Sequence, residues 1–191
     1  MIPSFYGCVQ DGDVIYLIQE FTTSSLESSK FINLYPSFTG RQKSDLMIQI
    51  ASKFEALHNK KIVHGNIQLA SLFTRGIVFD DIRIANFEYA NKEGSINPRK
   101  DSYFVSPVET ENRVLSYEGD VYALAVTFSM MEKPMYGFFC KLNMEGKINN
   151  PLLNEDLENF RSAVASSFNK KAETEHLAEV IARAINQDPS K

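Results

Sequence analysis

Three neutral polar side chains, Asn66, Ser71 and Asn86, stand next to short apolar runs in a part of the chain that reads as small strands and loops, a setting in which reactive groups are often held. Each can take part in hydrogen bonds, because carboxamides and hydroxyls both donate and accept. None is charged at neutral pH, so none can act as a general base or attract Mg²⁺ as a carboxylate does. These residue types favour loops in which polar side chains satisfy buried backbone groups.

The cysteines and histidines show no pattern of metal ligands. Cys8 and Cys140 are far apart, and His58, His64 and His176 add no spacing that is typical of a zinc site. We therefore expect no resident metal. Two isolated cysteines also fit a reducing compartment.

Composition excludes several classes of protein. With 191 residues, of which 43% are hydrophobic, the chain can bury the core of one domain. Its 20 basic and 24 acidic residues give a net charge of −4 with no basic stripe, which argues against a nucleic acid partner. Neither a signal peptide nor an apolar stretch of ~18 residues is present, so we expect no membrane span and a cytoplasmic protein, with the nucleus left open.

The elements that position these polar residues begin with a predicted β-hairpin. Phe5–Val9 and Val14–Ile18 have strand composition, and the polar stretch Gln10–Asp13 predicts the turn between them. Thr22–Ser25 follows, and its hydroxyl groups favour a hinge or a helix start over a core segment. This stretch is the best candidate for a domain boundary.

A helix is predicted from Ser44 to Asn59, with Ser44 or Asp45 as its N-cap. Apolar residues recur there on one helical face: Leu46, Ile50, Phe54 and Leu57.

Short apolar runs after this helix predict small strands and loops at 62–63, 72–73, 77–79 and 82–84. Asn91–Ser102 has the composition of a mobile loop. A buried helix is expected around five apolar residues: Val121, Leu124, Ala125, Phe128 and Met131. Two amphipathic helices are predicted at 155–168 and 175–186.

This order of elements resembles the protein kinase domain from its fourth strand onward. The residues 62–73 are similar to the catalytic loop, which reads H-R-D-L-x-x-x-N in active members, and 84–88 are similar to the D-F-G segment. Four further stretches match in order: Val14–Phe21, Ser106–Glu109, Asp120–Leu124 and Asn186–Lys191. The resemblance implies an α+β, mainly α fold, with a remnant small-lobe β-hairpin and hinge start at 1–21 and a kinase-like C-terminal lobe at 22–191.

The resemblance also assigns roles to residues. Asn66 stands at the position of the catalytic aspartate, where we expect it to be inert, and Asn86 replaces the metal-binding aspartate of D-F-G. Eight residues occupy nucleotide-pocket positions: Gln19, Glu20, Phe21, Thr22, Gln68, Ser71, Phe73 and Asn86. His64 and Phe87 match an internal hydrophobic column, and Asp120 matches the residue that holds the catalytic-loop backbone.

Regulatory features of the family are altered. Gly65 replaces the loop arginine that would receive a phosphate, so phosphorylation of Ser102 or Tyr103 lacks its usual receptor. Val108 stands where the A-P-E glutamate is expected, and Glu109 comes one residue later.

Three functional readings follow from these features. The first is a catalytically inactive pseudokinase that needs no cofactor and binds other proteins, with a kinase or a scaffold as candidates. The second is a divergent Ser/Thr or Tyr kinase that uses ATP and Mg²⁺. Because no G-x-G-x-x-G loop or V-A-I-K strand precedes the hairpin, its small lobe would lie upstream or be missing. The third is a truncated duplicate that aggregates, swaps domains or needs a partner to fold.

Overall fold

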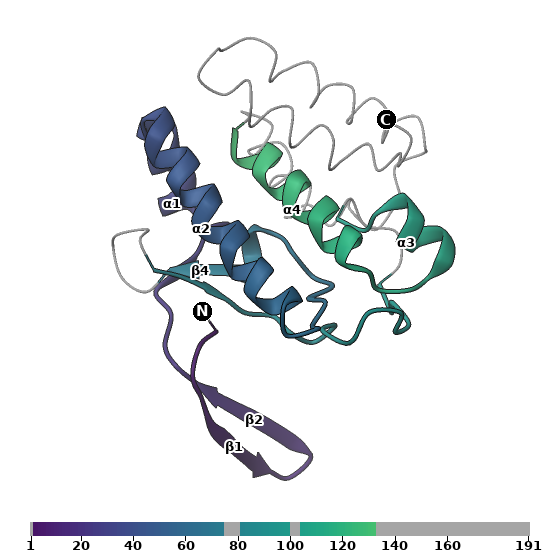
Figure 1. Cartoon of the computed structure of the whole chain (residues 1–191). Coiled ribbons are helices and arrows are strands. Elements are labelled where there is room, and N and C mark those ends of the chain that lie inside the picture. The colour runs from purple at the N-terminus through teal and green to yellow at the C-terminus, as the bar shows by residue number, and fades with distance from the viewer. Residues whose placement is uncertain (1, 75–80, 100–103, 133–191) are drawn as a thin grey trace.

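The computed structural model of the protein describes residues 2–74, 81–99 and 104–132 (Figure 1). Several predicted features lie outside these described residues: the strand at 77–79, the helices at 155–168 and 175–186, the sites Ser102 and Tyr103, and the stretch 186–191.

Within the described residues the chain forms two small sheets and four α-helices, so the expected mixed class of helices and strands is confirmed. The strands are β1 (Phe5–Asp11), β2 (Val14–Gln19), β3 (Ser24–Ser25), β4 (Leu72–Thr74) and β5 (Ile82–Ile84). The helices are α1 (Ser29–Leu34), α2 (Gly40–His58), α3 (Pro107–Asn112) and α4 (Tyr117–Glu132). Short 3₁₀ turns occur at Tyr35–Ser37 and Leu69–Ser71. None of the helices in the described ranges is long and apolar enough to cross a bilayer.

The predicted hairpin is present, with a tighter turn than expected. β1 and β2 pair antiparallel up to Asp11 and Val14, which leaves only Gly12 and Asp13 in the turn. Gly12 has a φ of 57°, a conformation that glycine adopts without strain in such turns. In Figure 1 the hairpin, drawn in purple, projects away from the helices.

The stretch Thr22–Ser25, predicted as a hinge or a helix start, includes a short strand. Ser24–Ser25 form β3, which pairs antiparallel with β4, and β4 pairs with β5. The first helix begins later, at Ser29, with Ser28 as its N-cap. Serine has no strong preference for strands, so the extended conformation of Ser24–Ser25 depends on pairing with β4.

Helix α2 confirms the predicted apolar face but begins earlier than predicted. Gly40, not a residue near Ser44, is its first residue, and the cap is Thr39, which forms a reciprocal capping box with Gln42. The Thr39 backbone N–H donates to the Gln42 side chain at 2.9 Å, and the Thr39 hydroxyl accepts from the Gln42 N–H at 3.3 Å. The cap satisfies backbone donors that have no partner inside the helix.

Thr39→Ala is expected to lower the free energy of unfolding by about 1 kcal/mol, because it removes the acceptor for the Gln42 N–H. Urea denaturation measures this loss. Ser52→Ala is the control, since the exposed Ser52 hydroxyl only donates to the Ile48 carbonyl inside the same helix. That change should stay within about 0.5 kcal/mol. Equal effects of the two substitutions would contradict a capping role for Thr39.

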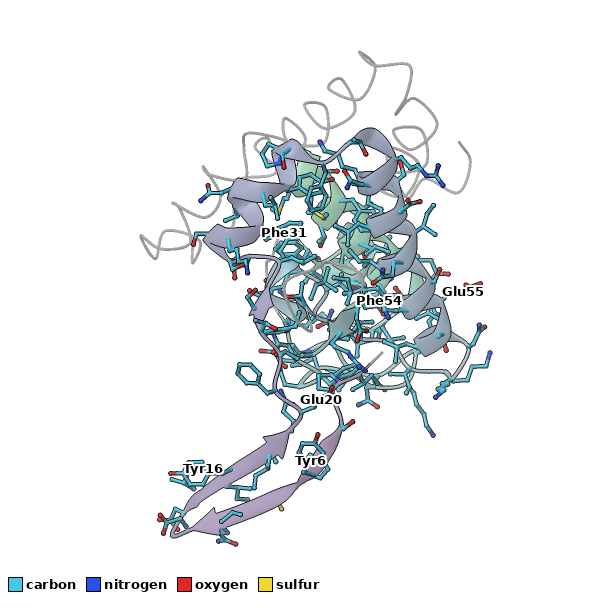
Figure 2. All side chains as sticks on the ribbon, turned by 90° about the vertical axis from the view of Figure 1, so that its left-hand side faces the viewer. Tyr6, Tyr16, Glu20, Phe31, Phe54 and Glu55 are labelled. Atoms are coloured by element: carbon cyan, nitrogen blue, oxygen red, sulfur yellow. The ribbon has the colours of Figure 1, made fainter. Side chains whose placement is uncertain are left out.

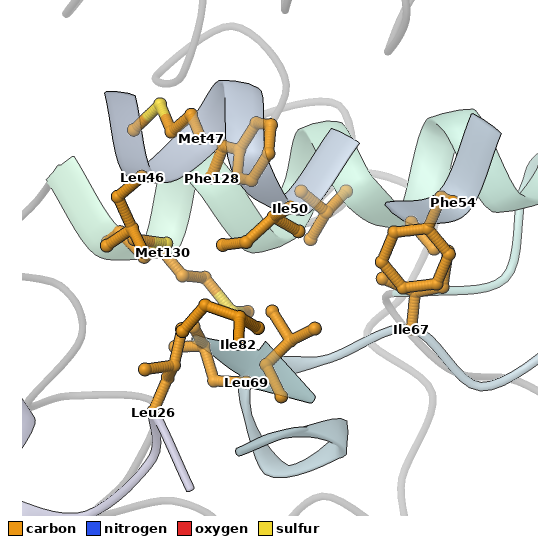
Figure 3. Packing of buried hydrophobic residues seen from close by; sticks show 14 of the residues in the cluster. Leu26, Leu46, Met47, Ile50, Phe54, Ile67, Leu69, Ile82, Phe128 and Met130 are labelled. Atoms are coloured by element: carbon orange, nitrogen blue, oxygen red, sulfur yellow. The ribbon is translucent and has the colours of Figure 1, made fainter. Parts of the chain in front are cut away.

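The hydrophobic core lies between α2, α4 and the sheet of β3, β4 and β5 (Figure 3). From α2 the side chains of Leu46, Ile50 and Phe54 enter it, each no more than 4% exposed. Phe128 and Met130 of α4 face them. The core therefore holds α2, α4 and this sheet together.

The predicted buried face of α4 was wrong in part. Val121 is 45% exposed and does not belong to that face, although Ala125, Phe128 and Met131 do. Residues 91–99 are joined to the rest of the chain by backbone hydrogen bonds between Asn91 and Val63 and between Asn97 and Arg113. Both partners are distant in sequence, so the polar composition gave no sign of them.

Candidate functional site

The loop between α2 and β4 is organised around His64, which is fully buried. Its ring lies between two phenylalanine rings: Phe54 of α2 at 5.6 Å and Phe87 at 4.7 Å between ring centroids. Both contacts are edge-on, the arrangement that aromatic pairs prefer over face-to-face stacking. Segments far apart in the sequence are thus held together by one histidine.

Hydrogen bonds define which nitrogen of His64 carries the proton. The Asn66 backbone N–H donates to Nδ1 at 3.2 Å, so Nδ1 must be an acceptor. Nε2 therefore carries the hydrogen and donates to the Ala85 carbonyl at 3.0 Å. Burial lowers the pKa of His64 below its usual value, which favours this neutral ring.

Asp120 of α4 binds the backbone of the same loop. Its Oδ2 accepts from the His64 backbone N–H at 2.7 Å, and its Oδ1 accepts from the Gly65 N–H at 2.9 Å. The His58 ring nitrogen Nε2 lies 2.9 Å from Oδ2. Only 2% of Asp120 is exposed, so these contacts replace the hydration that the carboxylate loses.

Asn66 is 4% exposed, and both ends of its carboxamide are occupied by neighbouring side chains. Its Nδ2 donates to the Glu88 carboxylate at 2.5 Å, and its Oδ1 accepts from Gln68 Nε2 at 3.2 Å. A carboxylate can only accept hydrogen bonds, so the atom of Asn66 that faces Glu88 must be the NH₂ group. The carboxamide is thereby fixed in one orientation and has no charge to offer.

Glu88 is a site residue that sequence reasoning missed. It is exposed, and it brings the one carboxylate that contacts Asn66 within the described residues. Its signal in the sequence was the acidic residue at the third position of the D-F-G-like stretch, where the family motif has glycine. Only the folded loop shows that this acid meets Asn66.

The two other polar loop residues are also engaged internally. The Ser71 hydroxyl is fully buried and donates to the Asn66 carbonyl at 2.7 Å. Asn86 has a φ of 63°, which asparagine tolerates better than most residues, and its Nδ2 donates to the Ala70 carbonyl at 3.1 Å. Both side chains thus hold the backbone of the loop, as the residue types suggested.

The remaining nucleotide-pocket positions lie at the end of the hairpin, in the stretch that follows it and on β4. Gln19 is exposed at the end of the hairpin, and Phe21 is 83% exposed. Thr22 is half-buried, and Phe73 lies in the middle of β4 with Ser25 and Arg83 as its strand partners.

Glu20 joins the base of the hairpin to the body of the protein. Its Oε2 accepts from the Ser4 backbone N–H at 3.1 Å, and its Oε1 lies 3.7 Å from the guanidinium of Arg83 on β5. Figure 2 shows Glu20 at this junction. The side chain therefore has a structural role at a position that the resemblance assigned to the pocket.

Gly65 leaves no room for the arginine that the family carries there. Its φ is 68°, and a Cβ added to it would lie 2.8 Å from Leu115 and 3.3 Å from the Tyr89 carbonyl. A different arginine reaches this loop, because Arg99 donates to the Gly65 carbonyl at 3.2 Å. The loop is therefore tied to residues 91–99 through its backbone.

In the stretch Ser106–Glu109, which resembles the A-P-E segment, Glu109 is a buried residue. It is 5% exposed, whereas Val108 is 48% exposed. Its carboxylate accepts from the Ser116 backbone N–H at 2.8 Å and from the Ser116 hydroxyl at 3.2 Å. Burial raises the pKa of Glu109 above its ordinary value, because the charged form loses hydration.

This raised pKa predicts how stability depends on pH. The folded state binds the Glu109 proton more tightly than the unfolded state, so stability from this group is greatest below pH 4.5 and is lost as pH rises through the folded-state pKa. Urea midpoints measured across this range should therefore fall less with pH in Glu109→Gln than in the wild type. Glu111→Gln, an exposed position on the same helix, controls for loss of one charge. Parallel curves for Glu109→Gln and the wild type would refute the prediction.

The mixed fold of helices and small sheets is compatible with part of a kinase-like domain. Aurora kinase of Saccharomyces cerevisiae is similar to the chain, with 28% identity over 126 residues. The similar region covers 63% of this chain and 33% of that relative, so the chain spans about a third of the length of the curated relative it matches. No family model matches the chain. The relationship to kinases is therefore a partial one.

Metal ligands are not clustered in the part of the chain that the structure describes. No group of three or more His, Cys, Asp and Glu side chains there could hold a metal ion. Around Asn66 the side-chain oxygens belong to carboxamides, a hydroxyl and the Glu88 carboxylate, and the groups described above are used in internal hydrogen bonds.

Proposed function

We propose that this chain is a kinase-like domain that does not transfer phosphate and acts by binding other proteins, with a kinase or a scaffold protein as candidate partners. The observation that carries the proposal is the Asn66 carboxamide, which is uncharged and bonded at both ends, to Glu88 and to Gln68. A substrate hydroxyl needs a carboxylate that can accept its hydrogen bond at this position. Asn66 has no negative charge, and its Oδ1 already accepts a hydrogen bond from Gln68 Nε2.

The residues around Asn66 also do not fit a complex of Mg²⁺ and nucleotide. Magnesium favours anionic oxygens in a near-octahedral arrangement. Asn86 and Ser71 are neutral and donate to backbone carbonyls, and the Glu88 carboxylate accepts from Asn66. We therefore propose that the domain works without ATP and Mg²⁺, in the cytoplasm or nucleus.

The alternative is a divergent protein kinase, and one observation favours it. Glu88 brings an exposed carboxylate to Asn66, the residue that the resemblance assigns to the catalytic position, and the relative with 28% identity is a kinase by name. In that case Glu88 would supply the negative charge that Asn66 lacks. The two functions differ in whether nucleotide binds with a dependence on Mg²⁺.

A thermal shift assay with ATP, with and without Mg²⁺, tests the proposal. Because a ligand that binds only the folded state stabilises it, ATP at about 100 times its Kd would add about 2.7 kcal/mol, or about 5–10 °C in Tm. We expect no Mg²⁺-dependent shift. A clear shift would overturn the proposal, and its loss in Glu88→Gln would establish the divergent kinase with Glu88 as a ligand. An active protein kinase treated identically is the positive control.

A further inference from the structure

His64 uses both of its ring nitrogens inside the protein. The residue is 0% exposed, its Nδ1 accepts from the Asn66 backbone N–H at 3.2 Å, and its Nε2 donates to the Ala85 carbonyl at 3.0 Å. Edge-on contacts with Phe54 and Phe87 hold the ring between these two partners. Each nitrogen at which the imidazole could exchange a proton is therefore occupied by a hydrogen bond.

The closed arrangement of this loop requires a neutral His64. A proton added to the ring must go to Nδ1, because Nε2 already carries one. The new N–H would then point at the Asn66 N–H, and two donors that face each other cannot form a hydrogen bond. The Asn66 N–H would lose its acceptor in a buried place, which is costly.

Charged groups approach His64 from each element packed against it, and they act in both directions. Asp120 of α4 accepts from the His64 backbone N–H at 2.7 Å and also contacts the ring of His58 on α2. Burial lowers the pKa of His64, and this effect outweighs the negative charges of Asp120 and Glu88, which raise it. The positive charge of Arg99 lowers the pKa further. The surroundings as a whole therefore favour the neutral ring.

Acid acts on the loop through this ring. When the loop opens, His64 regains contact with water and its ordinary pKa of 6.5, so the open form binds a proton more readily than the closed form. The closed loop is therefore most stable above pH 6.5, and it loses stability as the pH falls from 6.5 through the lowered pKa of the buried ring. Glu109 has the opposite effect, because burial raises its pKa.

We propose that His64 is an acid-sensitive lock on the loop that carries Asn66. In the neutral ring Nδ1 holds the Asn66 N–H, and the loop is closed. A proton from solvent that binds Nδ1 breaks this hydrogen bond, the ring becomes a cation, and the loop opens. This regulation goes beyond the proposed function and does not rest on it, because the same hydrogen bond holds the loop whether or not the Asn66 site transfers phosphate.

Hydrogen exchange of the Asn66 amide in the full chain tests the lock, because this N–H is the donor that Nδ1 holds. Between pH 6.5 and about pH 5.5 its protection, corrected for the intrinsic pH dependence of exchange, should fall about fivefold. This factor is the gain in protonation of an exposed histidine over one that stays neutral in the closed loop. The Ile50 amide, inside α2, should keep its protection. An equal loss at Ile50 would indicate global unfolding and overturn the proposal, as would unchanged protection at Asn66.

Two variants assign the pH dependence to one histidine. His64→Phe keeps an aromatic ring in the same place but cannot bind a proton, so protection of its Asn66 amide should change less than about twofold over this pH range. His58→Gln is the matched control, because it removes the histidine whose ring contacts Asp120 and keeps a side-chain donor. This control should lose protection as the wild type does. Loss of the pH dependence in His58→Gln would assign it to His58 and overturn the proposal.

Nitrogen NMR of the imidazole rings keeps the proposal testable if His64→Phe does not fold. In the wild type at about pH 7 the shifts should report a proton on Nε2 of His64 and none on Nδ1, the form that the hydrogen bonds require. A His64 ring that becomes charged while the Asn66 amide stays protected would overturn the proposal. Its failure is separate from that of the proposed function, because the ATP assay reads nucleotide and these measurements read a proton on His64.

Discussion

Asp120→Ala is expected to lower the free energy of unfolding by about 2–5 kcal/mol, the largest loss for a single substitution near the site. Alanine removes the acceptor for two backbone N–H groups, those of His64 and Gly65, where the protein excludes most water. A buried donor that loses its partner costs about 1–3 kcal/mol. The contact with His58 is lost as well.

Asp120→Asn separates the loss of hydrogen bonds from the loss of packing. The carboxamide has nearly the same shape but one acceptor oxygen, and its NH₂ group would face a backbone N–H. We therefore expect asparagine to lie between wild type and alanine, and Val121→Ala, exposed on the same helix, to change stability by about 0.5 kcal/mol or less. Urea unfolding measures the free energy of unfolding of all three variants, compared where its dependence on urea concentration is the same. If Asp120→Ala were no worse than Val121→Ala, Asp120 would not anchor the loop.

The local pattern of the chain predicted the elements whose own residues determine them. The apolar spacing of Leu46, Ile50 and Phe54 identified the buried face of α2, since that face depends on helical periodicity alone. The start of α2 escaped this reasoning, because Thr39 and Gln42 are polar and add nothing to the apolar pattern. Their pairing is nevertheless a recognisable capping signature.

Features that depend on distant partners could not be predicted in the same way. Ser24–Ser25 are extended because β4 lies beside them, and Asn91 is held by Val63. The candidate site shows the same limit. The resemblance identified Asn66, but the carboxylate that meets it comes from Glu88, in a different loop. The motif alone identifies Asn66 as a replacement, whereas the structure shows that Glu88 accepts a hydrogen bond from its side chain.

Asn66→Asp is expected to destabilise the protein by about 1–2 kcal/mol at pH 8, although the resemblance would favour aspartate at this position. Asn66 Nδ2 lies 2.5 Å from the Glu88 carboxylate, so aspartate would place a second carboxylate at hydrogen-bond distance from the first. Like charges so close cannot both ionise without cost. The exposure of Glu88 limits this cost, because water screens part of the repulsion.

A double-mutant cycle with Glu88→Gln isolates this repulsion. Glu88→Gln alone should change stability by about 0.5 kcal/mol or less, since its carbonyl can still accept from Asn66. In Asn66→Asp/Glu88→Gln the donor and acceptor roles are exchanged, so most of the stability lost in Asn66→Asp should return. Additive effects of the two substitutions would contradict direct coupling between these side chains.

The pH dependence of Asn66→Asp gives a second, independent test of the coupling. As pH falls, the two carboxylates can bind one shared proton, which replaces repulsion with a hydrogen bond. The destabilisation should therefore shrink under acidic conditions in Asn66→Asp and stay unchanged in the double variant. If the destabilisation shrinks in this way, the two carboxylates repel each other at neutral pH. An aspartate at position 66 would then be tolerated only if Glu88 were changed as well, because the carboxylate that now accepts from Asn66 would repel it.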